Sequence, residues 1–368
     1  MMRIGIIGTR GIPNQYGGFE QFVHFAAPEL IKRGHEVYVY VSSLHAYKEN
    51  TWQDVQLIHK YDPENKIGTA GQFIYDLNCI LDSRKRNFDV ILQLGYTSSS
   101  VWSFLFPKKA LVVTNMDGLE WGRAKYSKPV RLFLKKSESW AVLYRDHLIA
   151  DSKIIQQYLW ETFRKQSAFI PYGAALVTLT NDQFLLDKGI EKYGYDLLIA
   201  RMEPENNIET IIKGHRLSEF AKPLIIIGNN KNRYGSFLQK KYGSEKIQFW
   251  GPVFDMHILN CLRFYSYFYF HGHSVGGTNP SLLEAMASYS MIMAHDNIFN
   301  RTVLENDAFY FTTPADIAAT LNEQVKREDH SMMMQNNAEK IINFYSWDHI
   351  INSLENYLHE VVSIKRKK

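Results

Sequence analysis

Residues 271–287 read HGHSVGGTNPSLLEAMA and directly follow the apolar and aromatic run FYSYFYF at 264–270. The run is typical of a buried strand, and the apolar spacing after Pro280 is typical of a helix. Between them, Gly276 and Gly277 predict a tight turn from strand to helix. Backbone N–H groups and the positive end of the helix dipole meet at such a turn, so it can hold an anion such as a phosphate.

Glu284 is the single acid of this stretch, and we expect it in about the first turn of the helix. A carboxylate would repel a phosphate, but it can accept hydrogen bonds from both hydroxyl groups of a ribose. Phosphate at the glycine turn and ribose at Glu284 would together hold a nucleotide. The alternative is that Glu284 only interacts favourably with the helix dipole, as first-turn acids commonly do.

Short apolar runs alternate with helical patterns along all 368 residues, a length that predicts two domains. The predicted strands lie at residues 2–8, 37–41, 90–94, 110–114 and 147–150 and, after a restart, at 195–200, 223–227, 247–250 and 267–271. Strands separated by helices form parallel sheets that are covered on both faces. We therefore expect two doubly wound α/β domains, at 1–172 and 173–345, followed by an amphipathic helix and a basic tail at 346–368.

Composition excludes several classes of protein. Hydrophobic residues make up 45% and charged residues 22% of the chain, which is typical of an ordered globular protein. The two cysteines, Cys79 and Cys261, lie in separate apolar segments, so we expect neither a disulfide nor a zinc site. No apolar stretch has the length of a membrane span or a secretory signal. We expect a cytoplasmic protein without a nucleic-acid partner, and the net charge of +4 is modest.

The segment 122–136 is basic and contains no acid. Its basic residues are Arg123, Lys125, Lys128, Arg131, Lys135 and Lys136, and the apolar residues Leu132, Phe133 and Leu134 stand among them. Such a segment is either a solvated surface or a contact with an anionic membrane. The second interpretation would place the protein peripherally at the inner face of the membrane.

A second glycine turn is predicted near the N-terminus, in GTRGIPNQYGGFE at 8–20. Its glycines lack the spacing of a dinucleotide-binding fingerprint, and Pro13 breaks the helix start that this fingerprint requires. We therefore expect the helix to begin after Gly17 and Gly18, which makes this pair the phosphate-side turn. The alternative is a glycine pair that serves only to reverse the chain.

Two further candidates follow predicted strands, where ligands of parallel sheets gather. Arg201, in ARMEPENN at 200–207, can neutralise and hold a leaving diphosphate; the alternative is a salt bridge to Glu203 or Glu205. Asp117, in NMDGLEW at 115–121, can contact sugar hydroxyls or act as a base. The alternative for Asp117 is a helix N-cap.

A metal is not expected at these sites. His271 and His273 lack a third ligand at a convincing spacing, and no aspartate lies two positions from another. The metal-binding D-x-D element of many sugar-nucleotide enzymes is therefore absent from the sequence. We expect the diphosphate to depart without a metal and without another cofactor.

These four motifs resemble those of retaining glycosyltransferases of family 4, and more closely a subgroup that includes bacterial rhamnosyltransferases of polysaccharide assembly. The resemblance extends over essentially the full length of the chain. It implies the GT-B fold: two Rossmann-like domains that face a central cleft, with a C-terminal helix, here at 347–364, that crosses back to the first domain. It also implies retention of the anomeric configuration.

The resemblance assigns roles to single positions. Glu284 matches the second glutamate of the family's E-x7-E element, which holds the nucleotide ribose, whereas the first glutamate falls at Gly276. Arg201 matches the basic residue that contacts the donor diphosphate. The lysine that often follows it falls near Asn206, which leaves Lys231 as a candidate for this charge. Asp117 lies near the position at which many members of the family have an active-site histidine.

The expected site combines these assignments. The candidate catalytic residues are Asp117, Arg201 and Glu284. The candidate donor-binding residues are Gly17, Gly18, Arg201, Gly276, Gly277, Thr278, Asn279, Pro280, Ser281, Leu282 and Glu284.

The sequence thus predicts an enzyme that moves a sugar, with rhamnose as one candidate, from a nucleotide diphosphate to a hydroxyl group of a glycan or lipid-linked glycan. Two alternatives stay open. A GT-B isomerase or epimerase of UDP-sugars would use the same nucleotide pocket without an acceptor. A non-catalytic subunit that binds sugar nucleotides would explain the departures at Gly276 and Asn206.

Overall fold

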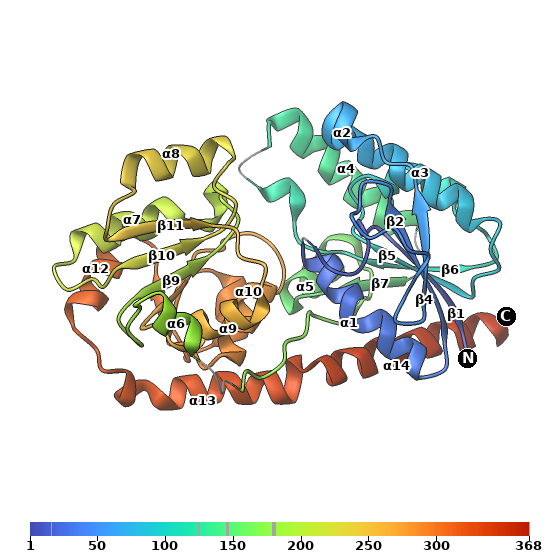
Figure 1. Cartoon of the computed structure of the whole chain (residues 1–368). Coiled ribbons are helices and arrows are strands. Elements are labelled where there is room, and N and C mark those ends of the chain that lie inside the picture. The colour runs from blue at the N-terminus through green and yellow to red at the C-terminus, as the bar shows by residue number, and fades with distance from the viewer. Residues whose placement is uncertain (16, 124–125, 145–146, 179–181, 368) are drawn as a thin grey trace. The chain divides into compact units, whose positions relative to one another are not determined.

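The computed structural model describes residues 1–15, 17–123, 126–144, 147–178 and 182–367. The chain forms two compact units. The first comprises Met1–Gly122, Tyr126–Tyr172 and Trp347–Lys368, and the second comprises Arg123–Lys125 and Gly173–Ser346. In each unit helices cover both faces of a largely parallel sheet (Figure 1).

The described residues of the first unit form an eight-stranded sheet in the order β3-β4-β2-β1-β5-β6-β7-β8. Neighbouring strands are parallel except for the antiparallel pair β3 and β4. The strands are β1 (Arg3–Ile7), β2 (Glu36–Ser42), β3 (Thr51–Trp52), β4 (Val55–Lys60), β5 (Val90–Leu94), β6 (Leu111–Asn115), β7 (His147–Ala150) and β8 (Ala168–Phe169). Strand order changes direction between β1 and β5, which is where doubly wound sheets bind ligands.

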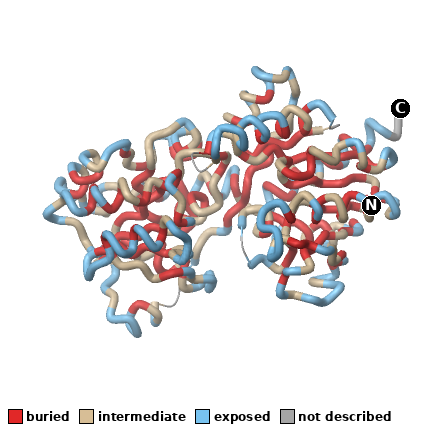
Figure 2. Tube along the Cα trace, turned by 90° about the horizontal axis from the view of Figure 1, so that it is seen from above, coloured by how far each residue is buried: buried red, intermediate tan, exposed pale blue. Residues whose placement is uncertain are grey.

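Apolar faces of the surrounding helices close the core of this unit. The helices are α1 (Gly18–Lys32), α2 (Glu64–Ile67), α3 (Gly71–Ser83), α4 (Lys128–Tyr144), α5 (Lys153–Phe163) and α14 (Trp347–Lys367), with the 3-10 segments η1 (Gly68–Ala70), η2 (Ser99–Leu105) and η3 (Glu120–Gly122). Strand residues such as Ile4, Val39 and Val113 are completely buried. The strands accordingly form the buried centre of the unit (Figure 2).

The described residues of the second unit form a six-stranded parallel sheet in the order β11-β10-β9-β12-β13-β14. The strands are β9 (Asp196–Ile199), β10 (Leu224–Ile227), β11 (Ile247–Gly251), β12 (Tyr269–His271), β13 (Ile292–His295) and β14 (Phe309–Phe311). Their side chains join a core that includes Leu198, Ile226, Phe268 and Phe270. The aromatic run at 264–270 supplies Phe268 and Phe270 to this core, but the predicted strand is wrong for most of it: Phe264 ends α9, and β12 begins only at Tyr269.

The second unit has its own set of helices. They are α6 (Gln183–Asp187), α7 (Ile208–Leu217), α8 (Arg233–Tyr242), α9 (Met256–Phe264), α10 (Pro280–Ala287), α11 (Ile298–Leu304), α12 (Pro314–Asn322) and α13 (Ser331–Lys340), with the 3-10 segments η4 (Pro204–Asn206) and η5 (Arg327–His330) and the π-helical segment η6 (Ile341–Tyr345). The core of this unit also takes side chains from α7, α8, α12 and α13. None of the helices in the described residues of either unit is long and apolar enough to cross a membrane.

The last helix, α14, returns the chain to the first unit. It starts directly after η6 of the second unit, and its residues are assigned to the first unit. The Trp347 ring stacks on Phe25 of α1 with centroids 4.4 Å apart, and the Tyr357 hydroxyl donates to the carbonyl of Leu148 in β7 at 3.2 Å. The expected C-terminal crossover helix is therefore present.

Candidate functional site

The second unit brings two of the predicted motifs to one edge of its sheet. Arg201 comes two residues after β9, and the glycine turn follows β12, its neighbour in the sheet. From β9 the chain adds β10 and β11 on one side and β12 to β14 on the other, so this edge is the topological switch point. Ligands of doubly wound sheets bind outside the carboxyl ends of the strands at this point.

Hydrogen bonds connect the loop after β9 to the loop after β12. The backbone N–H and the hydroxyl of Ser274 both donate to the carbonyl of Glu205, at 3.1 and 2.8 Å. The Asn207 amide donates to the carbonyl of Gly272 at 2.8 Å. A side chain at Gly272 would place its Cβ 2.0 Å from the Asn206 carbonyl oxygen, so this close approach of two backbones requires glycine.

Arg201 is exposed and makes no ion pair within the described part of the chain. The salt bridge to Glu203 or Glu205 that the sequence offered as an alternative is therefore wrong. The Arg201 carbonyl accepts a hydrogen bond from the Asn206 amide at 2.7 Å, which fixes the backbone from which the guanidinium projects. An exposed arginine at the switch point is suited to an anionic ligand.

A buried ion pair beside this edge was not predicted from the sequence. The Arg123 guanidinium lies 3.7 Å from the Glu205 carboxylate, and both side chains are buried. Arg123 is therefore not part of the solvent-facing basic segment in which the sequence placed it. A buried carboxylate such as that of Glu205 needs a cation beside it. The sequence alone does not show which basic residue supplies this cation.

Helix α10 begins as its sequence predicts. Asn279 is the N-cap and accepts a hydrogen bond from the Ser281 N–H at 2.9 Å, and Pro280 occupies the first helical position. The Ser281 hydroxyl is bound to Tyr269, and Leu282 is buried in the core, as is Thr278 beside the turn. The side chains at these positions stabilise the fold. A ligand at the start of α10 would therefore contact backbone N–H groups and not these side chains.

Glu284 lies in the second turn of α10, not the first, because the helix begins at Pro280. A helix dipole acts mainly on the first turn, so it does not account for this acid. Instead the Glu284 carboxylate forms an ion pair with the buried guanidinium of Arg263 in α9. Arg263 also donates to the Asn260 side chain at 3.2 Å, which fixes the cation. The partner of Glu284, 21 residues away in sequence, was missed by sequence reasoning.

In the first unit, Gly17 and Gly18 lie at the start of α1, with Gly17 as N-cap at φ 109°. Glu20 occupies the first turn and is buried beside them: a Cβ at Gly17 would lie 2.3 Å from its carboxylate. This carboxylate accepts hydrogen bonds from the Arg10 N–H at 2.8 Å and the Thr9 hydroxyl at 3.2 Å. Burial raises the pKa of Glu20, and these hydrogen bonds oppose the rise.

Asp117 is half-buried in the loop after β6 and is not a helix N-cap, because η3 begins three residues later at Glu120. Its loop is held by the Tyr96 hydroxyl, which donates to the Gly118 carbonyl at 3.3 Å. β6 and β1 are parallel strands separated by β5, so Asp117 and the Gly17–Gly18 turn follow strands at the same edge of the first sheet. Asp117 and the glycine pair belong to the first unit, whereas Arg201, the glycine turn and Glu284 belong to the second.

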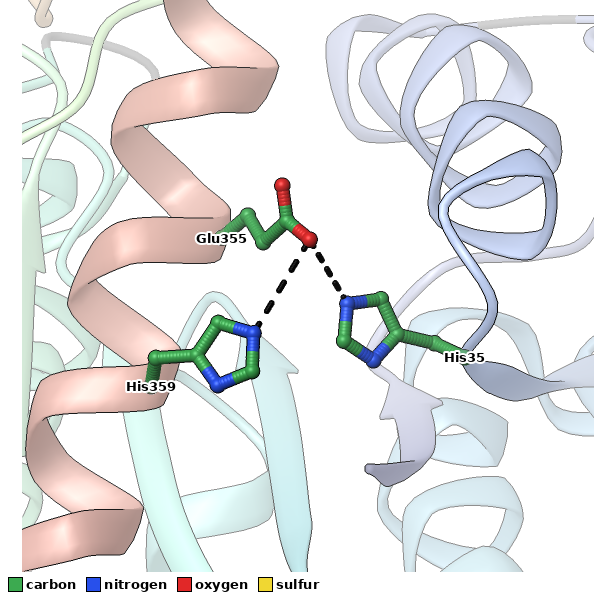
Figure 3. Close-up of side chains that lie close together, drawn as sticks. All are labelled: His35, Glu355 and His359. Carbon is green, nitrogen blue, oxygen red and sulfur yellow. Dashed lines mark hydrogen bonds and ion pairs between the residues drawn. The ribbon is translucent and has the colours of Figure 1, made fainter. Parts of the chain in front are cut away.

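Three titratable side chains gather elsewhere in the first unit: His35, Glu355 and His359 (Figure 3). Their spacing could hold a metal ion, but the tautomer of His35 opposes this. Its Nδ1 accepts the backbone N–H of Met2 at 3.1 Å, so its Nε2 carries the hydrogen that points to Glu355 at 2.9 Å. A histidine that ligates a metal normally donates from its other nitrogen. With Arg33 2.7 Å from the same carboxylate, this cluster ties α14 to the end of α1.

A hollow of about 670 Å³ lies at the opposite, amino edge of the second sheet. Four cations line it: Arg216, Lys222, Lys241 and Lys246. None of the predicted site residues lines this hollow, so it does not belong to the candidate site.

Comparisons with known proteins identify the fold. A family model described as a domain of unknown function (DUF1972) matches residues 1–175, and no curated protein matches the chain. Sucrose-phosphate synthase from Thermosynechococcus elongatus superposes with a TM-score of 0.81 at 15% identity, over 99% of this chain and 100% of that one. HepE from Anabaena, solved with UDP-glucose, gives a TM-score of 0.77 at 13% identity, over 98% and 100%.

A glycosyltransferase from Rickettsia africae gives a TM-score of 0.69 at 13% identity, over 98% of both chains. The similarity spans both units and the C-terminal helix. The protein therefore has the GT-B fold, as expected. At these identities the similarity defines the architecture and leaves the activity to be argued from the residues.

Proposed function

We propose that the protein is a glycosyltransferase that moves a sugar from a nucleotide diphosphate to a hydroxyl group of a glycan or lipid-linked glycan. The observation that supports this proposal is the arrangement at the switch point of the second unit. An exposed Arg201 and the N-terminus of α10 follow neighbouring strands and are both suited to phosphate. Glu284, held by Arg263, is the acid we assign to the ribose.

The finer assignment rests on the motif resemblance: family 4, retention of configuration, and rhamnose as the candidate sugar. In the proposed step the bond between the sugar anomeric carbon and the diphosphate oxygen breaks. The acceptor oxygen forms its bond on the same face of the sugar, and its proton passes to the departing diphosphate. Arg201 and the α10 N-terminus stabilise the charge that develops on this diphosphate, typically the largest contribution to such catalysis. No metal or other cofactor is assigned a role.

A donor screen tests this proposal directly. Thermal shift with dTDP-rhamnose, UDP-glucose and GDP-mannose should identify a donor, because a ligand at a hundred times its Kd stabilises by roughly 2.7 kcal/mol. Nucleotide release that requires an added acceptor glycan would support transfer. Conversion of the donor without acceptor would favour the isomerase, and binding without any turnover would favour the non-catalytic subunit.

We further propose that the protein works at an anionic membrane surface, at the cytoplasmic face. Helix α4 supports this: Lys128, Leu132 and Lys136 recur at four-residue intervals and share one exposed face. Leu132 is 71% exposed, as is Phe104 of η2 at 75%. Positive charge around exposed apolar side chains complements anionic headgroups above an acyl layer. Leu134 faces the core, and Lys125 lies outside the described residues.

Liposome co-sedimentation tests this location. Binding should rise with anionic lipid content and fall with salt, since each basic residue near such a surface contributes about 1 kcal/mol. Neutralising Lys128, Lys135 and Lys136 with glutamine should release the protein. A matched control is the same change at exposed lysines and arginines of the second unit: Lys188, Arg233 and Lys240. Equal release by both triple variants would show that α4 is only a solvated surface.

A further inference from the structure

His273 stands directly before the glycine turn, and its neighbours determine which ring nitrogen carries the hydrogen. The Asn206 Nδ2 donates to the Arg201 carbonyl at 2.7 Å, so the amide oxygen of Asn206 faces the other way. This oxygen lies 2.8 Å from Nδ1 of His273. Because an amide oxygen only accepts, Nδ1 must donate, and in a neutral imidazole Nε2 is then left as a hydrogen-bond acceptor.

The position of this acceptor is set by Gly276. The residue has φ 136°, which side chains rarely adopt, and a Cβ there would lie 2.9 Å from Nε2 of His273. The imidazole therefore occupies the space that a side chain at 276 would enter. A side chain at the position where the motif resemblance expects a glutamate is therefore strained in this backbone, and a histidine nitrogen occupies the space beside it.

The surroundings keep this imidazole neutral. Burial is the largest cause that lowers the pKa of His273 well below its ordinary value. His271 and the cations Arg123 and Arg201 lower it further, and only the smaller effect of the Val275 backbone opposes them. His273 as a residue is nevertheless only partly buried, and its Nε2 lies beside Gly276 of the turn.

We propose that His273 is a specificity-determining residue of the nucleotide-sugar site: its Nε2 accepts a hydrogen bond from one hydroxyl group of the transferred sugar. This proposal rests on the proposed function. A neutral acceptor selects a neutral sugar that presents a hydroxyl group at this point. Asn206 is a positioning residue, because it holds the ring in the accepting tautomer. The same pair explains why Asn206 and Gly276 both lack the charges that the resemblance expects: a neutral amide–imidazole pair replaces a cation and an anion.

Calorimetric binding tests the role by comparing a sugar nucleotide with its nucleoside diphosphate. The probes are UDP-glucose with UDP and dTDP-rhamnose with dTDP. His273→Phe keeps a flat ring and removes the acceptor, and it should weaken sugar-nucleotide binding about three- to tenfold while leaving the nucleoside diphosphate unaffected. His273→Gln retains an acceptor oxygen and should lose less. His271→Phe, the same change at a buried histidine two residues earlier, is the matched control. It should change the affinities for the sugar nucleotide and the nucleoside diphosphate by the same factor.

A purely structural role of His273 would give a different result, because a distorted turn would weaken the binding of the sugar nucleotide and of the nucleoside diphosphate equally. Equal losses for both ligands, or no loss in His273→Phe, would overturn the proposal while leaving the proposed function intact. Absence of binding of every probe by the wild type would overturn both.

The tautomer provides a second, ligand-free test. Nitrogen chemical shifts of the His273 ring should report hydrogen on Nδ1 and a bare Nε2, and Asn206→Leu should abolish this preference. A ring that carries its hydrogen on Nε2 would refute the assignment.

Discussion

Replacement of Glu284 by alanine should destabilise the second unit even in the absence of a ligand. The Arg263 side chain is only 2% exposed and relies on the Glu284 carboxylate, so the substitution strands a buried cation. Loss of one partner from a buried ion pair typically costs about 3–5 kcal/mol. For a unit of this size each kcal/mol lowers Tm by about 2–4 °C, which gives an expected decrease of roughly 6–20 °C. Scanning calorimetry of the full chain measures it.

A double variant separates this structural role from ribose binding. Arg263→Met combined with Glu284→Ala removes both charges, and apolar replacement of a buried pair is often neutral or stabilising. The double variant should therefore regain most of the lost Tm. It should still bind the donor weakly, because two charge-assisted hydrogen bonds of about 1.5–3 kcal/mol each would be missing. Their loss corresponds to roughly 10²–10⁴-fold in affinity.

Two results would refute this reasoning. A single Glu284→Ala variant with wild-type Tm would show that Arg263 does not depend on the carboxylate. A double variant that regains donor affinity together with stability would show that Glu284 only supports the fold. Glu284→Gln is the conservative control, because its amide oxygen can still accept from Arg263.

Three further substitutions test single positions. Arg201→Ala should lower kcat and kcat/KM together, because charge on the leaving diphosphate grows toward the transition state; a raised KM with full kcat would make Arg201 a ground-state binding residue. Gly276→Ala should cost about 1–3 kcal/mol in urea unfolding through its positive φ and its contact with His273, and wild-type stability would contradict this. Because burial raises the folded pKa of Glu20 above its ordinary 4.5, wild-type stability should fall as pH rises from about 4.5 through the folded value. Burial also raises the pKa of Asp76 and Glu138, so Glu20→Gln should reduce that fall without abolishing it, and an unchanged pH profile would show that Glu20 does not contribute to it.

The sequence predicts the strands and the fold well, because fully buried strands of parallel sheets are continuous apolar runs. The predicted strands at 90–94 and 147–150 coincide with β5 and β7. Strands β3, β4, β8, β13 and β14 were not predicted: in β4 Gln56 breaks the apolar run and polar residues end it, and the other four have only two to four residues. Short or alternating strands carry less of this signal.

Side-chain partners in the candidate site were much harder to predict than its backbone. The glycine turn and the N-cap follow from local rules, since each involves residues a few positions apart. The pairs of Glu284 with Arg263 and of Glu205 with Arg123 join different helices and loops, and only tertiary packing decides them. His273 was considered from its sequence only as a metal ligand, because its tautomer depends on Asn206, 67 residues away.

The two glycine turns differ in the charge around them, and this difference assigns phosphate binding to one of them. Glu20 is buried beside Gly17 at the start of α1, so an anion bound there would face a carboxylate or require it to take up a proton. The turn at Gly276 instead adjoins a neutral imidazole and the exposed cation Arg201, while the charge of Arg123 beside it is balanced by Glu205. The positive end of a helix dipole favours an anion only where no negative side chain beside it opposes this effect. The second unit is therefore where we expect the diphosphate to be held, and the first turn is better suited to a neutral, hydroxyl-bearing group.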